Sequence, residues 1–95
     1  MAIRTWACSE TREIFQGHGS RLIPGSVLER AHRKLLILNA ATDLRDLREP
    51  PSNRLEKLRG DRKGQFSIRV NNQFRVCFQW RNSDAYQVEI IDYHR

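Results

Sequence analysis

Three consecutive residues near the C-terminus, Asp92, Tyr93 and His94, combine side chains that can move protons near neutral pH. A histidine with an ordinary pKa of about 6.5 can donate or accept a proton, and a neighbouring carboxylate can orient it or act as a base itself. A tyrosine ring can stack on a nucleobase or hydrogen-bond to phosphate. The three residues therefore suggest general acid–base chemistry on a phosphate-containing substrate.

Two arginines, Arg69 and Arg75, lie in segments where apolar and polar residues alternate, the pattern of half-buried strands. Successive side chains of a strand point to opposite faces. The sets expected on the apolar face are Phe66, Ile68 and Val70; Phe74, Val76, Phe78 and Trp80; and Tyr86, Val88 and Ile90. We expect the other face to present both arginines as rigid, forked phosphate donors. The alternative is that Arg75 merely pairs with Glu89 across the sheet.

The elements that must hold these residues precede them in the chain. Residues 3–8 read as a short strand, and Ser9 is a plausible N-cap for a helix of about two turns. A longer helix is expected from Ser26, where Ser26 and Glu29 have the form of a capping box. Its apolar stripe comprises Leu28, Ala31, Leu35 and Leu38. The predicted fold class is α+β, with the N-terminal strand and two main helices packed on one face of an antiparallel sheet.

A basic segment, residues 53–63, connects the helices to the sheet. Leu55 and Leu58 are expected to pack on the core, which leaves Lys57 and Arg59 facing outward. The whole chain carries a formal net charge of +6. Such an excess points to a polyanionic partner, and nucleic acid is the natural one.

Length and composition limit the class of protein. We expect the 95 residues to form a single domain, residues 1–95. Cys8 and Cys77 lie far apart and lack metal-ligand spacing, so neither a disulfide framework nor a metal site is expected. The sequence has no apolar run of transmembrane length and no signal-peptide core, and we expect a cytoplasmic protein without a cofactor.

Several of these segments, taken in order, resemble the HigB-type toxins of the RelE-like superfamily. The matching segments are Leu44–Leu55, Leu58–Asn71, Phe74–Phe78 and the C-terminal Asp92–His94. The resemblance covers nearly the whole chain, and the ordered combination is more specific than any one segment. It implies a small ribosome-dependent endoribonuclease that a helix-turn-helix antitoxin of the HigA type neutralises.

The resemblance also implies roles for individual residues. Arg75 matches the family's strand arginine, which contacts the scissile phosphate. The Asp92-Tyr93-His94 sequence matches the family's C-terminal motif near the cleaved nucleotide, and Arg59 takes a basic position that is often lysine. Some relatives carry a further arginine near the hairpin turn, where this chain has Asn71, and Arg69 is the candidate to replace it. The predicted site therefore comprises His94, Asp92, Tyr93 and Arg75 as catalytic residues and Arg59, Lys57, Arg69 and Asn71 as RNA- or phosphate-binding residues.

The implied reaction is attack of an RNA 2′-OH on the adjacent phosphate, with mRNA held in the ribosomal A site. It needs a base, an acid and positive charge on the phosphate, and these residue types supply all three. The implied partners are the antitoxin, the 70S ribosome, with rRNA contacting the basic surface, and mRNA. Two alternatives remain open. One is a nucleic-acid-binding module without catalysis, and the other is a toxin with a different target, such as gyrase.

Overall fold

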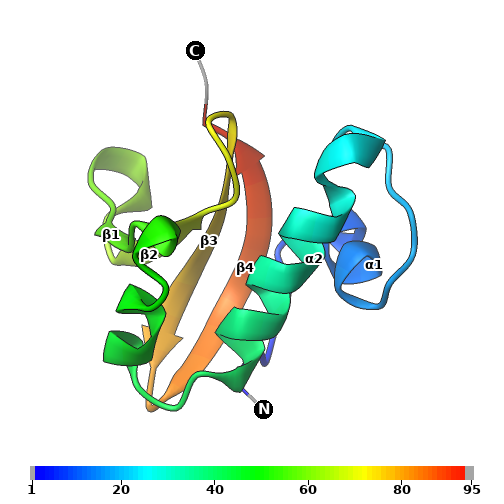
Figure 1. Ribbon diagram of the computed structural model, residues 1–95. Coiled ribbons are helices and arrows are strands. Elements are labelled where there is room, and N and C mark those ends of the chain that lie inside the picture. Colours follow the sequence, from blue (N-terminus) through cyan, green and yellow to red (C-terminus); the bar gives the residue numbers. More distant parts are fainter. Residues whose placement is uncertain (1, 94–95) are drawn as a thin grey trace.

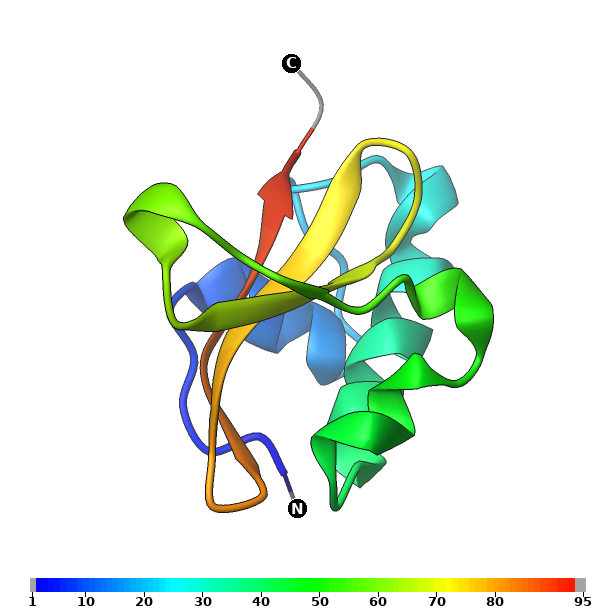
Figure 2. The same cartoon turned by 90° about the vertical axis from the view of Figure 1, so that its left-hand side faces the viewer.

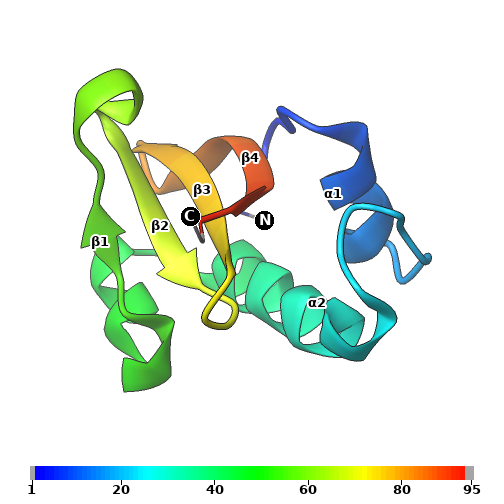
Figure 3. The same ribbon diagram turned by 90° about the horizontal axis from the view of Figure 1, so that it is seen from above.

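The computed structural model describes residues 2–93, which form a four-stranded antiparallel sheet in the order β1-β2-β3-β4. The strands are β1 (Glu56–Lys57), β2 (Gln65–Arg69), β3 (Phe74–Arg81) and β4 (Asp84–Asp92). The helices are α1 (Ser9–Phe15) and α2 (Gly25–Ala40), with 3-10 turns η1 (Leu44–Arg48), η2 (Pro51–Asn53) and η3 (Gly60–Arg62). In Figures 1 and 3, α2 runs along one sheet face and α1 lies beside it at the β4 end. The predicted α+β fold is confirmed.

The hydrophobic core lies between α2 and the sheet. Of the predicted stripe of α2, Ala31, Leu35 and Leu38 are fully buried there, and Leu28 is partly buried. The larger strand residues of the same core cluster that expose no surface are Ile68, Val76, Phe78 and Val88. Each such large apolar side chain stabilises the fold by about 1.5–3 kcal/mol. This core fixes β3 and β4, the strands that carry the candidate catalytic residues. No helix within residues 2–93 is long and apolar enough to cross a membrane.

Neither of the predicted serine caps forms. In α2 the N-cap position is taken by Pro24, and no side chain makes a capping hydrogen bond there. The helix therefore begins before Ser26, and the predicted capping box with Glu29 is wrong. In α1 the N-cap position belongs to Cys8, so Ser9 is already inside the helix.

The N-terminal segment follows β4 without forming the strand predicted over residues 3–8. Only two isolated parallel bridges occur there, from Ile3 to Ala85 and from Trp6 to Val88. Between these bridges β4 bulges at Gln87, whose φ is +53°. The bulge interrupts the row of backbone groups that a continuous edge strand would need.

The same bulge overturns one predicted alternation. Tyr86 pairs with Gln79 and Ala85 pairs with Trp80, while the register shifts between Cys77 and Gln79. Ala85, rather than Tyr86, therefore takes the buried position next to Val88. The Tyr86 ring instead lies under a guanidinium, 4.0 Å from the carbon of Arg81. An extra residue in one strand reverses the faces of the residues beyond it.

The sheet face opposite the helices is covered in part by the connector, residues 54–63. Figure 2 shows α1 behind the sheet, α2 to the right of the strands, and the green to yellow-green connector on the viewer's side. Beneath it, Ser67 and Cys77 expose no surface and Arg75 is only 6% exposed. The expectation that this face presents Arg75 to solvent is therefore wrong. Leu55 and Leu58 had been predicted to hold this segment on the core. Leu58 is buried, and Leu55 is partly buried against the core.

Candidate active site

Arg75 is the second residue of β3, which has a paired strand on each side. Its Cα is paired with that of Arg69 on β2 and that of Ile91 on β4. The side chain leaves the sheet on the face that the connector covers. A buried arginine is rare unless its donors are satisfied, so its partners define the site.

Backbone and side-chain acceptors hold the Arg75 guanidinium. Its Nε donates to Ser67 Oγ at 2.7 Å, and its Nη2 donates to the carbonyl oxygens of Arg54 and Ser67. Arg54 adopts a left-handed backbone with φ of 44°, which is uncommon for a residue with a side chain. The carboxylate of Glu56 is 3.8 Å from Nη2. The predicted alternative, a pairing of Arg75 with Glu89, is wrong.

Tyr93 lies against this guanidinium, just beyond the end of β4. Its ring centre is 5.6 Å from the guanidinium carbon of Arg75, within the range of a cation–π contact. The backbone N–H of Tyr93 donates to the carbonyl of Gln73 in the β2–β3 turn, which fixes the position of the residue. The side chain remains 46% exposed. A buried cation therefore lies beside an aromatic ring that substrate can reach.

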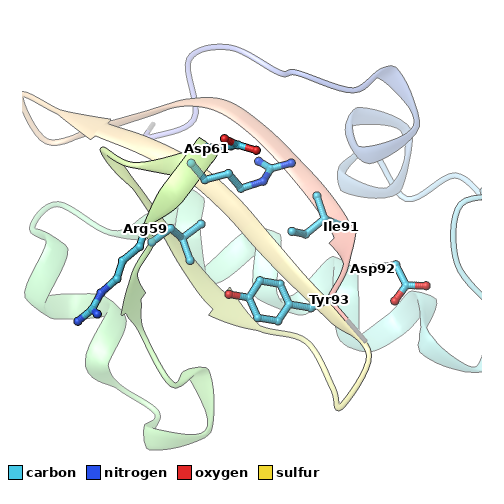
Figure 4. A pocket seen from close by; sticks show the side chains of 7 residues that line it. Arg59, Asp61, Ile91, Asp92 and Tyr93 are labelled. Carbon is cyan, nitrogen blue, oxygen red and sulfur yellow. The ribbon is translucent and has the colours of Figure 1, made fainter. Parts of the chain in front are cut away.

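A cavity of about 480 Å³ opens beside Tyr93. Its lining residues are Leu58, Arg59, Asp61, Arg62, Ile91, Asp92 and Tyr93. In Figure 4 the Arg59 side chain points away from the Tyr93 ring, and the Asp92 carboxylate lies on the opposite side from Arg59. One Asp92 oxygen accepts a hydrogen bond from Gln73 Nε2 at 3.0 Å. Three of the eight predicted site residues thus line one cavity.

Arg62 belongs to the cavity wall, although its basic segment alone did not single it out. Its Nη1 lies 3.0 Å from both Glu89 Oε2 and Gln65 Oε1, which ties η3 to the sheet. The ion pair with Glu89, which lies 27 residues further along the chain, holds the Arg62 side chain in place in the cavity wall. The sequence analysis had offered Arg75 as a partner for Glu89, whereas Glu89 pairs with Arg62 in the structure.

The other predicted phosphate-binding residues lie elsewhere. Lys57 is exposed on β1 and lines a smaller neighbouring cavity together with Arg59. Arg69 lines a separate cavity against α2, and Asn71 uses its side-chain oxygen to accept the backbone N–H groups of Gln73 and Phe74. The structure therefore separates Arg69 from the Tyr93 cavity. The predicted catalytic His94 lies outside the described residues.

Cys77, two residues after Arg75 on β3, does not contribute a nucleophile. Burial raises the pKa of its thiol to about 11, and the carboxylate of Glu89 also raises it. A thiol must ionise to attack, so this one is inert near neutral pH. Within residues 2–93, no three His, Cys, Asp or Glu side chains gather closely enough to hold a metal ion.

Residues 10–94 match the model of a family described as the RelE-like toxin of the type II toxin–antitoxin system HigB. The chain belongs to this family of HigB-type toxins. It is 57% identical over 60 residues to Toxin HigB-1 of Vibrio cholerae, and the match covers 63% of each protein, less than two thirds of that relative. It is 35% identical over 72 residues to Endoribonuclease HigB of Proteus vulgaris, covering 76% of this chain and 77% of the relative. The family match includes the Arg75 strand, the connector and Tyr93.

Proposed function

We propose that this HigB-type chain is the toxin of a type II toxin–antitoxin system and an endoribonuclease that cleaves mRNA in the ribosomal A site. The observation that carries this proposal is the fixed Arg75 guanidinium against Tyr93, beside a cavity lined by Arg59 and Asp92. Membership of the family supports the toxin role. The name of the Proteus vulgaris relative, an endoribonuclease, supports RNA cleavage.

In the proposed reaction, the 2′-oxygen of the RNA attacks the adjacent phosphorus and the 5′-oxygen leaves with a proton. The products are a 2′,3′-cyclic phosphate and a 5′-hydroxyl. Arg75 supplies positive charge that stabilises the phosphate as negative charge develops on it, and Arg59 holds the neighbouring backbone. Because its partners hold Arg75 in place before RNA binds, little reorganisation is needed at the moment of reaction.

Tyr93 and the two residues that flank it complete the proposed machinery. The exposed Tyr93 ring stacks on a base of the single-stranded message, the usual way in which proteins hold unpaired RNA. His94 and Asp92 transfer the protons, a role proposed from their chemistry alone. Lys57 extends the positive surface beside Arg59.

The proposed partners follow from the same role. An enzyme that cleaves mRNA on ribosomes acts in the cytoplasm and contacts rRNA through its basic surface. A HigA-type antitoxin with a helix-turn-helix fold would bind the chain and block its activity. Expression of the chain alone should then arrest bacterial growth, and co-expression of its antitoxin should restore it.

The direct test is cleavage of an mRNA programmed on purified 70S ribosomes, mapped by primer extension. We expect cleavage within the A-site codon, none without ribosomes, and none when the attacking nucleotide carries a 2′-deoxyribose. Cleavage that ignores the deoxy substitution would refute the 2′-OH mechanism. Absence of cleavage by folded protein would overturn the proposal in favour of a non-catalytic nucleic-acid-binding module or a different target such as gyrase.

A further inference from the structure

A second cavity, of about 320 Å³, lies between α2, η2 and the end of β2. Its lining residues are Arg30, Arg33, Lys34, Ile37, Pro50, Ser52, Arg69 and Val70. It shares no lining residue with the Tyr93 cavity. We refer to it below as the α2 groove.

The α2 groove concentrates positive charge. Four of its lining residues are cations, and none of the lining residues is acidic. Arg30 and Arg33 are exposed and stand three residues apart on α2, which places their side chains on one side of the helix. Arg69 reaches the groove from the sheet. Cations from two elements thus converge on one space without a carboxylate in its wall.

Lys34 forms the buried floor of this charge cluster. The residue is only 7% exposed. Its Nζ donates to Asn53 Oδ1 at 2.6 Å and lies 3.4 Å from Ser52 Oγ. Both acceptors are neutral, so they satisfy donors of the ammonium without cancelling its charge.

The titration of Lys34 agrees with an uncompensated cluster. Burial lowers the pKa of Lys34 below its ordinary 10.5, and the charges of Arg30, Arg33 and Arg69 lower it further. A bound anion would favour the charged ammonium and relieve the repulsion among these groups. The cluster therefore costs free energy in the absence of an anion and would gain from one.

We propose that the α2 groove binds phosphate groups of an RNA backbone and is a second RNA contact, separate from the cavity where cleavage occurs. The forked guanidinium of arginine matches the oxygens of a phosphate group. A site with several cations should bind a ligand with several phosphates better than a ligand with a single carboxylate. This inference rests on the proposed function, because it assumes that RNA is the partner. It assigns Arg30, Arg33 and Arg69 to binding and none of them to catalysis.

The two RNA contacts are connected through η2 and the residue that follows it. Ser52 and Asn53 accept from Lys34 in the groove, and the Arg54 carbonyl accepts from Arg75 in the candidate active site. A backbone phosphate seated in the groove would therefore restrain the segment that also holds Arg75. The RNA would contact the protein on both sides of this segment.

The experiment measures binding of a short, fluorescent single-stranded RNA with 2′-O-methyl riboses, which cannot be cleaved. The triple variant Arg30→Ala/Arg33→Ala/Arg69→Ala is compared with Arg12→Ala/Arg21→Ala/Arg48→Ala, which removes the same charge from exposed positions outside both cavities. Each lost phosphate contact reduces the slope of log K against log salt by about 0.7 for single strands. We expect the groove variant to lose about 2 in slope and at least about tenfold in affinity, and the control to change little.

Equal slopes and affinities for the two triple variants would overturn the proposal. So would displacement of the RNA by inorganic phosphate at an equal concentration of phosphate groups, which would make the groove a site for free anions. If the groove variant binds RNA as the wild type does but no longer binds the antitoxin, the groove is a protein interface and the proposal is overturned. If the triple variant does not fold, Arg33→Glu at an exposed helix position should weaken RNA binding on its own, and normal binding by that variant would refute the groove.

This test is independent of the cleavage reaction. Because the RNA cannot be cut and no ribosome is present, a failure of ribosomal cleavage would leave the groove result standing. Conversely, normal ribosomal cleavage by wild-type protein with no difference between the triple variants would overturn the groove and leave the proposed function intact.

Discussion

The guanidinium carbon of Arg75 lies 5.6 Å from the centre of the Tyr93 ring. The two residues come from β3 and from the end of β4, so the contact depends on the register of these strands. It joins a charge that is almost fully buried to a ring that is nearly half exposed. A substrate that stacks on Tyr93 would thus come within reach of the electrostatic field of Arg75.

Ser67 should act as a positioning residue for Arg75, because its hydroxyl accepts from Nε at 2.7 Å. Ser67→Thr keeps the hydroxyl. Ser67→Val introduces a side chain of nearly the same shape as threonine but without the hydroxyl. We expect the valine variant to cleave about tenfold more slowly than the threonine variant, the equivalent of about one charged hydrogen bond. RNA affinity should be the same for both. Equal single-turnover cleavage rates would show that this hydrogen bond does not position Arg75 for the reaction.

Tyr93 is expected to act through its ring. Tyr93→Phe keeps the aromatic face beside Arg75, and Tyr93→Leu removes it. Loss of one stacked base costs about 1–3 kcal/mol, so Tyr93→Leu should weaken binding of uncleavable RNA by about 5- to 150-fold. Tyr93→Phe should bind nearly as wild type does. If both variants bind equally weakly in the same fluorescence titration, the hydroxyl rather than the ring makes the contact.

The two thiols should differ in reactivity and in their effect on stability with pH. Cys77 is buried with a pKa raised to about 11, whereas Cys8 is half-buried. At pH 8 a disulfide reagent should modify Cys8 promptly, and Cys77 only in denaturant.

Between about pH 9 and 11 the Cys77 thiol ionises first in the unfolded state, so the folded state binds more protons and loses stability as pH rises. Urea titrations of wild type and Cys77→Ala should show this added decline only in the wild type, and prompt modification of both thiols would contradict the account.

Asn53 links the α2 groove to the segment before the connector. Its side-chain nitrogen donates to the carbonyls of Leu47 and Glu49, both at 3.1 Å, and its oxygen accepts from Lys34. Asn53→Ala would leave these buried groups unpaired and should lower the free energy of unfolding by about 2–4 kcal/mol. Asn72→Ala, at an exposed position, should change it by less than about 0.5 kcal/mol. A comparable loss in the two variants would deny Asn53 this role.

The sequence predicted the parts of the fold that depend on periodicity. The spacing of Ala31, Leu35 and Leu38 identified the buried side of α2, and the alternation around Val76 identified the core face of β3. Both signals arise because apolar side chains recur at the period of the element that buries them. The same alternation put Arg75 on the opposite face, which the structure confirms.

Other features depend on long-range contacts that periodicity does not encode. Nothing local indicated that β4 would bulge at Gln87 and turn Tyr86 away from the core. The burial of Arg75 follows from how the connector folds back over the sheet. The strand alternation therefore identified the face of Arg75 correctly but not its exposure.

The positions of Lys34 and Arg69 in the α2 groove could not be predicted from the sequence. On a helical pattern Lys34 belongs to the polar face, and burial of a lysine is uncommon. Its burial requires Asn53, nineteen residues away, to accept from its ammonium group. Strand alternation placed Arg69 on the same face as Arg75, and the two residues are paired across the ladder. The Arg69 side chain nevertheless lines the α2 groove together with Arg30 and Arg33.

The most direct test of the central claim is the single-turnover rate of mRNA cleavage on 70S ribosomes by Arg75→Ala. Arg81→Ala, an exposed arginine on the same strand, serves as the matched control. Removal of one group that stabilises a transition state typically costs 10²–10³ in rate, so we expect a loss of about 100-fold or more for Arg75→Ala. Arg75→Gln, which removes the charge but keeps side-chain donors, gives the same test if the alanine variant is unstable. Folded Arg75→Ala or Arg75→Gln that cleaves at the rate of Arg81→Ala would contradict the account.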